Sequence, residues 1–240
     1  MAELITPEQP RIKFGLRRVG THEVAEARAS RELRALCELM LQMEAAGAAP
    51  VLNDGKVGGN CALDEDLALD MGPQASRPVG PEVQAAATGC RASASGTGDS
   101  HAAAILVSRS GKAPGAALAA EDFARVCAFD RAAWAADYQS PSEALRPSAD
   151  TPLLWACLAP GAREAYGWTA RPRVAFHGHA LESGAGLLAA RRRGIPVSER
   201  ETLFSTREDL GELEALFKAH PYPQHRVYVR CAQHACGTTC

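Results

Sequence analysis

The sequence predicts an α/β fold in which helices are layered on a sheet, and two observations support this. Short apolar runs with strand character alternate along the chain with longer segments whose apolar residues recur at helical spacing. Hydrophobic residues make up 46% of the 240 residues, which is enough for a sizeable packed core. We therefore expect a layered domain rather than a bundle or a sandwich of strands alone.

The helices are expected where apolar side chains repeat with a helical period. Residues 21–47 show this repeat, and Thr21 is the expected N-cap. A second helix is expected from Asp150 to about residue 158, because proline at position 152 suits an early helical position. Further helices are expected over the small-residue segment 180–192 and over 205–219, which starts with a capping-box pattern at Ser205.

The strands are expected in short apolar or alternating segments between these helices. The segments are 61–70, 104–107, 125–129, 173–176 and 226–231. Residues 55–60 form a glycine-rich turn, and residues 141–150 form a polar loop. The segment at about 71–103 is rich in Gly, Ser, Ala and Pro, so we expect a flexible surface insertion there.

Charge and hydropathy exclude several classes of partner. The formal net charge is -2, from 26 basic and 28 acidic residues, so the sequence lacks the excess of basic residues that is typical of nucleic-acid-binding proteins. No apolar run reaches the roughly 18 residues of a membrane span. The N-terminus lacks the apolar core of a secretory signal. The sequence therefore predicts a cytoplasmic protein with neither nucleic acid nor membrane as partner.

The eight cysteines are scattered along the chain, and several lie inside apolar segments. Most are therefore expected to be buried free thiols rather than a disulfide framework. Three of them, Cys231, Cys236 and Cys240, are closer together and flank His234. A cysteine–histidine zinc site in this segment remains an alternative, although it contains no C-x-x-C pair.

His177 and His179 follow the apolar strand expected at 173–176 and are separated only by Gly178. Side chains alternate along a strand with a period of two, so both imidazoles are expected on the same side. Two neighbouring imidazoles suit zinc or another divalent metal, which makes the pair candidate metal ligands. The alternative is a structural or surface pair of histidines.

His234 is the candidate third ligand. It follows the strand expected at 226–231, and it reaches the histidine pair if that strand lies beside 173–176. Three histidines with one open position are the stoichiometry of a catalytic rather than a structural zinc site. The alternative is a solvated histidine near the C-terminus.

Three loops have the composition of an anion site. Gly58, Gly59 and Asn60 offer backbone N–H groups and an amide, and the segment 108–112 (SRSGK) adds hydroxyls and positive charge. The segment 148–151 (SADT) opens a helix, where the dipole favours an anion. Each loop taken alone also fits an ordinary turn, and Asp150 alone also fits a helix cap.

The serial order of these motifs, G-G-N, I-L-V-S-R-S-G-K, P-S-A-D-T-P-L, V-A-F-H-G-H-A and V-Y-V-R-C-A-Q-H, resembles the class II aldolase/adducin family. This family includes fuculose-phosphate aldolase and ribulose-phosphate 4-epimerase. The resemblance runs from about Leu33 to the C-terminus and is interrupted by the 71–103 insertion. It implies an N-terminal extension over 1–20 and one domain over 21–240. The implied fold is a three-layer α/β/α sandwich around a mainly antiparallel sheet, assembled as a homotetramer.

The resemblance also implies roles for individual residues. His177, His179 and His234 match the metal ligands of the family. Asp150 falls where the family usually has a catalytic glutamate that also ligates the metal. The positions that match those holding a substrate phosphate are Gly59, Asn60, Ser110, Gly111 and Ser148.

The chain departs from the family pattern at several positions. Ala149 replaces a usual serine, Asp150 is one methylene shorter than glutamate, and Ala235 replaces a usual glycine. Glu143 is a rival for the acid, although the sequence that follows Asp150 matches the family better. The aromatic acid–base residue of the family has no clear match. The strand and helices that usually follow the third histidine in the family also have no match in this sequence.

Taken together, the resemblance implies a metal-dependent aldolase-like lyase with zinc or another divalent metal as cofactor. It would cleave a ketose phosphate to an aldehyde through an enediolate in carbohydrate metabolism. The same chemistry supports a metal-dependent epimerase or dehydratase of this family. A non-catalytic adducin-like interaction module is the alternative of another class. The small-molecule partner is expected to be a sugar phosphate, whose sugar the sequence does not name.

Overall fold

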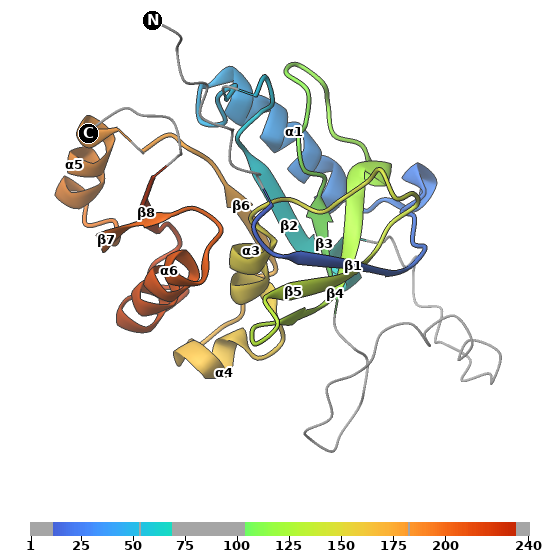
Figure 1. The fold of residues 1–240 in the computed structure, drawn as a ribbon. Helices are drawn as coiled ribbons and strands as arrows, with labels where there is room; N and C mark the ends of the chain where they lie inside the picture. The colour runs from blue at the N-terminus through green and yellow to red at the C-terminus, as the bar shows by residue number, and fades with distance from the viewer. Residues whose placement is uncertain (1–11, 53, 69–103, 182, 234–240) are drawn as a thin grey trace, which may run out of the picture.

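The computed structural model describes residues 12–52, 54–68, 104–181 and 183–233. The chain is an α/β protein with a six-stranded, mixed and mainly antiparallel sheet packed against helices, plus a small two-stranded sheet (Figure 1). The strand order of the larger sheet is β1–β5–β4–β3–β2–β6, in which β1 and β5 are parallel and the other neighbours are antiparallel. The α/β class that the sequence predicts is confirmed.

The strands of the six-stranded sheet are β1 (Gly15–Gly20), β2 (Asn60–Asp64), β3 (Ile105–Ser108), β4 (Phe123–Asp130), β5 (Ala135–Gln139) and β6 (Val174–His177). The second sheet pairs β7 (Val197–Leu203) with β8 (Val229–Gln233) in parallel.

The α-helices are α1 (Arg31–Ala45), α2 (Glu65–Ala68), α3 (Thr151–Leu158), α4 (Ala162–Tyr166), α5 (Gly184–Arg192) and α6 (Arg207–Ala219). Short 3-10 turns occupy Glu26–Arg28 and Ala120–Asp122. Within the described ranges, no helix combines the length and the apolar character that crossing a membrane requires.

Strand β2 lies between two helical layers, because successive side chains of a strand point to opposite faces. Cys61 and Leu63 belong to the hydrophobic cluster of α1, whereas Ala62 belongs to the cluster that contains Leu154 and Leu158 of α3. All the residues of β2 are buried. The sheet is therefore covered on both faces, by α1 on one side and α3 on the other (Figure 1).

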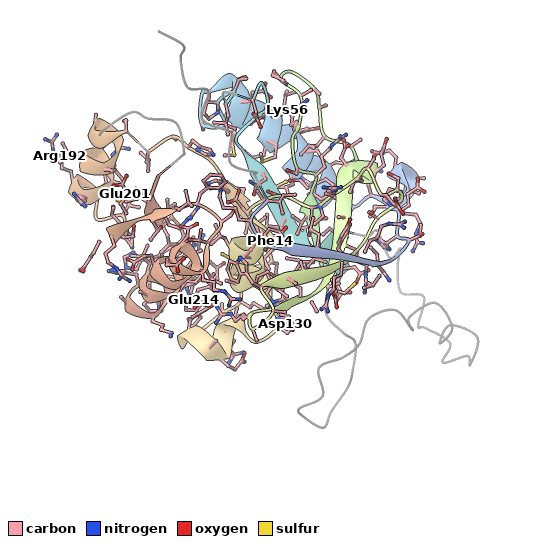
Figure 2. The ribbon with its side chains drawn as sticks, viewed as in Figure 1. Phe14, Lys56, Asp130, Arg192, Glu201 and Glu214 are labelled. Atoms are coloured by element: carbon pink, nitrogen blue, oxygen red, sulfur yellow. The ribbon has the colours of Figure 1, made fainter. Side chains whose placement is uncertain are left out.

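Helix α6 packs outside α3 through an aromatic cluster. The rings of Tyr166 and Trp168 lie 5.2 and 5.0 Å from that of Phe217 on α6, and the Trp168 indole donates a hydrogen bond to the Phe217 carbonyl at 3.0 Å. Each buried ring contributes on the order of 2 kcal/mol. Figure 2 shows side chains filling the space between the sheet and the helices. On α6, the Glu214 carboxylate accepts a hydrogen bond from the Tyr166 hydroxyl at 2.7 Å. This cluster fixes α6, and with it the loop that precedes α6, against the rest of the domain.

The expected helices are present, but α1, α5 and α6 begin later than predicted. Helix α1 begins at Arg31, where Ser30 is the N-cap and accepts a hydrogen bond from the Leu33 N–H at 3.0 Å. The prediction of Thr21 as its cap is therefore wrong. Ser30 is held extended because its own N–H donates to the Ala68 carbonyl. Helix α6 is likewise capped by Thr206 and not by Ser205.

The strands also differ in part from their expected extent. Residues 15–20, expected in an N-terminal extension, instead form the edge strand β1. The segment expected as a strand over 61–70 ends at Asp64 and turns into α2. Strands β5 and β7 were not predicted, because their short polar-rich sequences carry little apolar alternation. The insertion expected at 71–103 lies almost entirely outside the described residues.

The predicted position of the last strand is wrong. Strand β8 pairs with β7, whereas β6 pairs with β2, so the segment 226–231 does not lie beside 173–176 in a common sheet. The register places Val229 opposite Val197, and the Val229 N–H donates to the Pro196 carbonyl at 2.9 Å.

The described cysteines are free thiols, as the sequence predicts. Burial raises the pKa of the Cys37 thiol to about 11, and desolvation also raises the pKa of Cys157 to about 12. Such thiols remain protonated at neutral pH and are inert nucleophiles. The free thiols are Cys37, Cys61, Cys127, Cys157 and Cys231.

Candidate functional site

The residues predicted from separate motifs come together in one pocket at the end of β6. Its lining includes Gly59, Asn60, Ser110, Gly111, Ser148, Asp150, His177 and His179. Each of these was a candidate on sequence grounds. His234, the predicted third metal ligand, lies outside the described residues. The remaining lining comes from Leu52, Val57, Gly58, Arg109, Ala149, Phe204 and Arg230.

The pairing of β2 with β6 sets the geometry of the pocket floor. Asn60 begins β2 and lies directly opposite His177, the last residue of β6. Side chains directly opposite each other on antiparallel strands lie on the same face and within contact distance. Accordingly, the Asn60 amide Nδ2 lies 3.4 Å from His177 Nδ1.

Asp150 completes a buried polar cluster with these two residues. Its Oδ2 accepts a hydrogen bond from Asn60 Nδ2 at 2.6 Å and lies 3.1 Å from His177 Nδ1. Burial by itself would raise the pKa of the Asp150 carboxyl. His177, Arg230 and Asn60 outweigh burial and hold that pKa well below its usual range. Asp150 is therefore an ionised carboxylate at neutral pH.

The structure distinguishes Asp150 from its rivals. Glu143 lies in a different pocket, together with Ile12, Leu16 and Tyr138, and does not line the pocket of the histidines. Asp150 precedes the first turn of α3, but its side chain makes no capping hydrogen bond. Its carboxylate instead faces Asn60 and His177. The pocket of the histidines thus contains Asp150 and not Glu143. Asp150 is the N-cap residue of α3, but only its backbone carbonyl accepts hydrogen bonds from the helix.

The two histidine rings lie side by side, with centroids 4.7 Å apart at an interplanar angle of 54°. The His179 N–H donates to the Ala48 carbonyl at 2.7 Å, so the loop after α1 holds the end of this segment. Gly178 lies against the same loop. A Cβ atom at position 178 would lie 2.6 Å from the Ala48 oxygen and 2.7 Å from Met43 Cε. Only glycine fits here without a shift of the backbone.

The predicted anion loops are tied to one another by backbone hydrogen bonds. The Ser148 N–H donates to the Ser108 carbonyl at 3.0 Å, and the Ser110 N–H donates to the Arg146 carbonyl at 2.9 Å. The Ser148 hydroxyl oxygen accepts a hydrogen bond from the Asp150 N–H at 3.1 Å, which leaves its proton available to a ligand. Gly111 has a positive φ of +75°, which glycine adopts readily. The loops therefore form one corner of the pocket.

A buried ion pair supports this corner from behind. Lys112 Nζ lies 2.5 Å from Glu44 Oε2 at the end of α1, and the Lys112 side chain is almost entirely buried. The Glu44 carboxylate also accepts a hydrogen bond from the Gly115 N–H at 2.7 Å. The loop that carries Ser110 and Gly111 is thus fastened to α1, the same helix whose following loop supports the histidine pair.

Sequence analysis did not identify Phe204 or Arg230 as pocket residues. Both come from the segment around the two-stranded sheet, Phe204 just after β7 and Arg230 within β8. A charged residue inside a strand with alternating apolar positions was the available signal for Arg230. Its place in the pocket depends on how the second sheet docks, which no local pattern specifies.

The donor set fits a divalent metal in chemistry. Imidazoles are typical ligands of zinc, and Asn60 Oδ1 is a buried oxygen with no hydrogen-bond partner among the described residues. In the described part of the chain, no three His, Cys, Asp or Glu side chains are grouped closely enough to hold an ion by themselves. The third ligand expected from the sequence, His234, lies beyond that part.

Comparisons with family models, with curated proteins and with solved structures found no match for this chain. The arguments about function therefore rest on the geometry of the pocket and on the sequence motifs that form it.

Lys13 lies behind the pocket wall, with its Nζ atom 3.0 Å from the centroid of the Phe204 ring. This Nζ atom is shielded from solvent and has no hydrogen-bond partner among residues within the described ranges. Burial lowers the pKa of the Lys13 ammonium from 10.5 to about 8, although the Asp150 and Asp209 carboxylates act in the opposite direction. The Lys13 ammonium thus places a poorly solvated positive charge behind the Phe204 ring.

Replacing Gly178 by alanine is expected to destabilise the protein by about 1–3 kcal/mol, because the new methyl group collides with backbone at Ala48. The measurement is the free energy of unfolding in urea. Gly211→Ala is the matched control: it lies inside α6 with open space around it, so alanine there should be neutral or stabilising. Equal stability of the Gly178→Ala variant and the wild type would contradict the close approach.

Replacing Lys13 by methionine is expected to stabilise the protein at pH 7, because a poorly solvated charge is removed. In the wild type, the unfolded chain keeps this proton up to about pH 10.5, whereas the folded chain loses it near pH 8. Lys13 therefore makes wild-type stability rise between these pH values. The difference in unfolding free energy between variant and wild type should shrink over the same range. The matched control is Lys218→Met, which removes an exposed lysine charge. Its unfolding free energy is compared with that of the wild type over the same pH range.

Proposed function

We propose that this protein is a metal-dependent, aldolase-like lyase that cleaves a ketose phosphate. One observation carries the proposal: residues from four distant segments, each matched to a motif of the class II aldolase/adducin family, line a single pocket. The G-G-N, S-R-S-G, S-A-D and H-G-H segments are far apart in the sequence, yet all four contribute to this cavity. Unrelated turns would not be expected to do so. Membership of this family is part of the proposal.

The metal would be held by His177 and His179, with His234 as the expected third ligand. Zinc or another divalent ion bound there would act as a Lewis acid for a substrate carbonyl and would stabilise negative charge on its oxygen. The Asp150 carboxylate accepts the His177 Nδ1–H, which fixes the ring orientation and directs Nε2 away from Asp150. A carboxylate behind a ligating histidine is a common arrangement in zinc proteins.

The substrate phosphate would bind in the corner formed by the tied loops. Backbone N–H groups of Gly59 and Gly111 and the hydroxyls of Ser110 and Ser148 are donors suited to phosphate oxygens. Arg109 adds positive charge at the rim, where it pairs with Asp122 at 3.2 Å and is half-exposed. Binding of the phosphate positions the carbon–carbon bond at the far end of the substrate beside the histidines.

Asp150 is the residue that would move the proton. In the cleavage, the hydroxyl next to the breaking bond transfers its proton to the carboxylate, and its carbon becomes that of an aldehyde. The electron pair of the broken carbon–carbon bond passes to the carbonyl-bearing fragment. That fragment then takes up a proton and leaves as the ketone. Asn60, which donates to the same carboxylate oxygen, holds Asp150 in place for this transfer.

The same arrangement supports two other reactions of the family, epimerisation and dehydration, since both require a polarised carbonyl and a nearby carboxylate. A non-catalytic, adducin-like interaction module is the alternative of another class. The buried cluster of Asn60, Asp150 and His177 counts against the module, because desolvating such groups is costly and a binding surface does not need them.

Replacing His177 by alanine is expected to abolish both zinc binding and cleavage of ketose phosphates, while the protein stays folded because His177 lies at the end of an edge strand. The measurements are zinc stoichiometry by elemental analysis, aldehyde release on a panel of ketose phosphates, and thermal melting. His225→Ala, outside the pocket, is the matched control and should retain both properties. One equivalent of zinc in the His177→Ala variant would remove this residue from the metal site.

Replacing Asp150 by asparagine is expected to lower turnover by about 100-fold or more, while zinc occupancy changes much less. The measurement is kcat alongside metal content, with Glu143→Gln as the control in the neighbouring pocket. Should Glu143→Gln lose turnover and Asp150→Asn keep it, the assignment of the acid would be reversed.

A further inference from the structure

Arg230 is a charged residue in the pocket to which the proposed chemistry gives no role. Its side chain is about nine-tenths buried, yet it lines the same pocket as Asp150 and the histidines. A desolvated guanidinium needs acceptors for its N–H donors.

The backbone on both sides of Arg230 is fixed. The Val229 N–H donates to the Pro196 carbonyl at 2.9 Å, and the Cys231 N–H donates to the Ser198 hydroxyl at 2.8 Å. Arg230 therefore enters the pocket from a hydrogen-bonded strand. Sites built on strands hold a charged group more precisely than sites on loops.

Asp209 holds the guanidinium from behind. This carboxylate is fully buried and forms an ion pair with Arg230. Its Oδ2 accepts a hydrogen bond from the Ser205 N–H at 2.9 Å, and its Oδ1 accepts one from the Thr202 hydroxyl at 3.1 Å. Asp209 is thus well satisfied apart from Arg230, and stability alone gives little reason to bury this pair.

The Arg230 guanidinium has more N–H donors than the ion pair with Asp209 uses. An arginine side chain carries five N–H donors, and the structure gives Arg230 one ion-pair partner, Asp209, among the described residues. The remaining donors form a planar fork that matches the two oxygens of a carboxylate. The proposed phosphate corner is formed by other elements, the loops at the ends of β2, β3 and α3. Arg230 therefore offers a second anion-binding group from a different element, the β7–β8 sheet.

We infer that Arg230 binds a carboxylate of the substrate, so that the substrate class is a phosphorylated sugar acid. This inference rests on the proposed function, since it names the substrate of the same pocket. The phosphate occupies the corner of Ser110, Gly111 and Ser148, and the carboxylate pairs with Arg230 on the side of Asp150. Such a substrate carries an acid group at each end, one for each anion-binding group of the pocket.

Three small probes separate the two anion-binding groups. Phosphoglycolate carries a phosphate and a carboxylate, glycerol phosphate carries only the phosphate, and glycolate carries only the carboxylate. Their affinities for the full-length protein are measured by calorimetry, with zinc and after its removal with a chelator. The metal-free series matters because a carboxylate also binds zinc directly, whereas pairing with Arg230 persists without the metal.

In the wild type, phosphoglycolate should bind more tightly than glycerol phosphate. Arg230→Gln should weaken phosphoglycolate and glycolate by about 10- to 100-fold and leave glycerol phosphate unchanged, because hydrogen bonds to a charged group are lost. Arg226→Gln is the matched control, because Arg226 is exposed and lies outside the pocket. This variant should bind all three probes with the affinities of the wild type. If Arg230→Gln unfolds because Asp209 loses its partner, the double variant Arg230→Gln/Asp209→Asn replaces it.

Other results overturn the inference. Equal weakening of glycerol phosphate and phosphoglycolate would make Arg230 a phosphate ligand. Unchanged affinity for all probes would reduce Arg230 to a counter-charge for Asp209, and failure of every probe to bind the wild type would also reject the carboxylate site. The proposed function fails separately, if the wild type holds no zinc and releases no aldehyde. Binding of glycolate that depends on Arg230 would survive that failure.

Discussion

The antiparallel pairing of β2 with β6 is the constraint on which the candidate site depends. It places Asn60 opposite His177 at the end of the sheet, where the Asp150 carboxylate meets both side chains. A slip of one residue would turn His177 to the other face, because side chains alternate along a strand. Such a slip is costly because Cys61 and Leu63 pack under α1 while Ala62 packs under α3. The two hydrophobic clusters therefore fix the geometry of the polar cluster.

Several features that cost folding free energy lie in the pocket or directly behind it. Asp150 and Asp209 are buried carboxylates, and Ser205 has a positive φ of 57°, which is strained for a residue with a side chain. The Ser205 hydroxyl donates to the Ala149 carbonyl at 2.5 Å, so the strained residue joins the β7–α6 connection to the loop that carries Asp150. Costs of this kind persist where surrounding contacts enforce them, and they cluster at functional sites.

Local patterns predicted most of the site, and tertiary docking determined the rest. The H-G-H pair after an apolar run, and the glycine- and serine-rich loops, identified residues that line one pocket. Ser30, rather than Thr21, caps α1 because its backbone N–H is held by Ala68, a contact between distant segments. Arg230 and Phe204 were missed for the same reason, since they reach the pocket through the docking of a second sheet. β8 was expected beside β6, and the register with β7 shows that apolar alternation does not select a strand's neighbour.

The pocket residues come from two parts of the fold, and the proposal gives the two parts different roles. The six-stranded sheet and the loops at its edge provide the histidines, Asp150 and the proposed phosphate corner, whereas the β7–β8 unit provides Phe204 and Arg230. The contacts between the units include the hydrogen bond from the Ser205 hydroxyl to the Ala149 carbonyl and the packing of α6 on α3. In the proposed function, a change at Arg230 would alter which acid group the pocket accepts. Asp209 holds both Arg230 and the Ser205 N–H, and the Ser205 hydroxyl donates to the Ala149 carbonyl. One buried carboxylate therefore links the proposed carboxylate-binding group to the loop that carries Asp150.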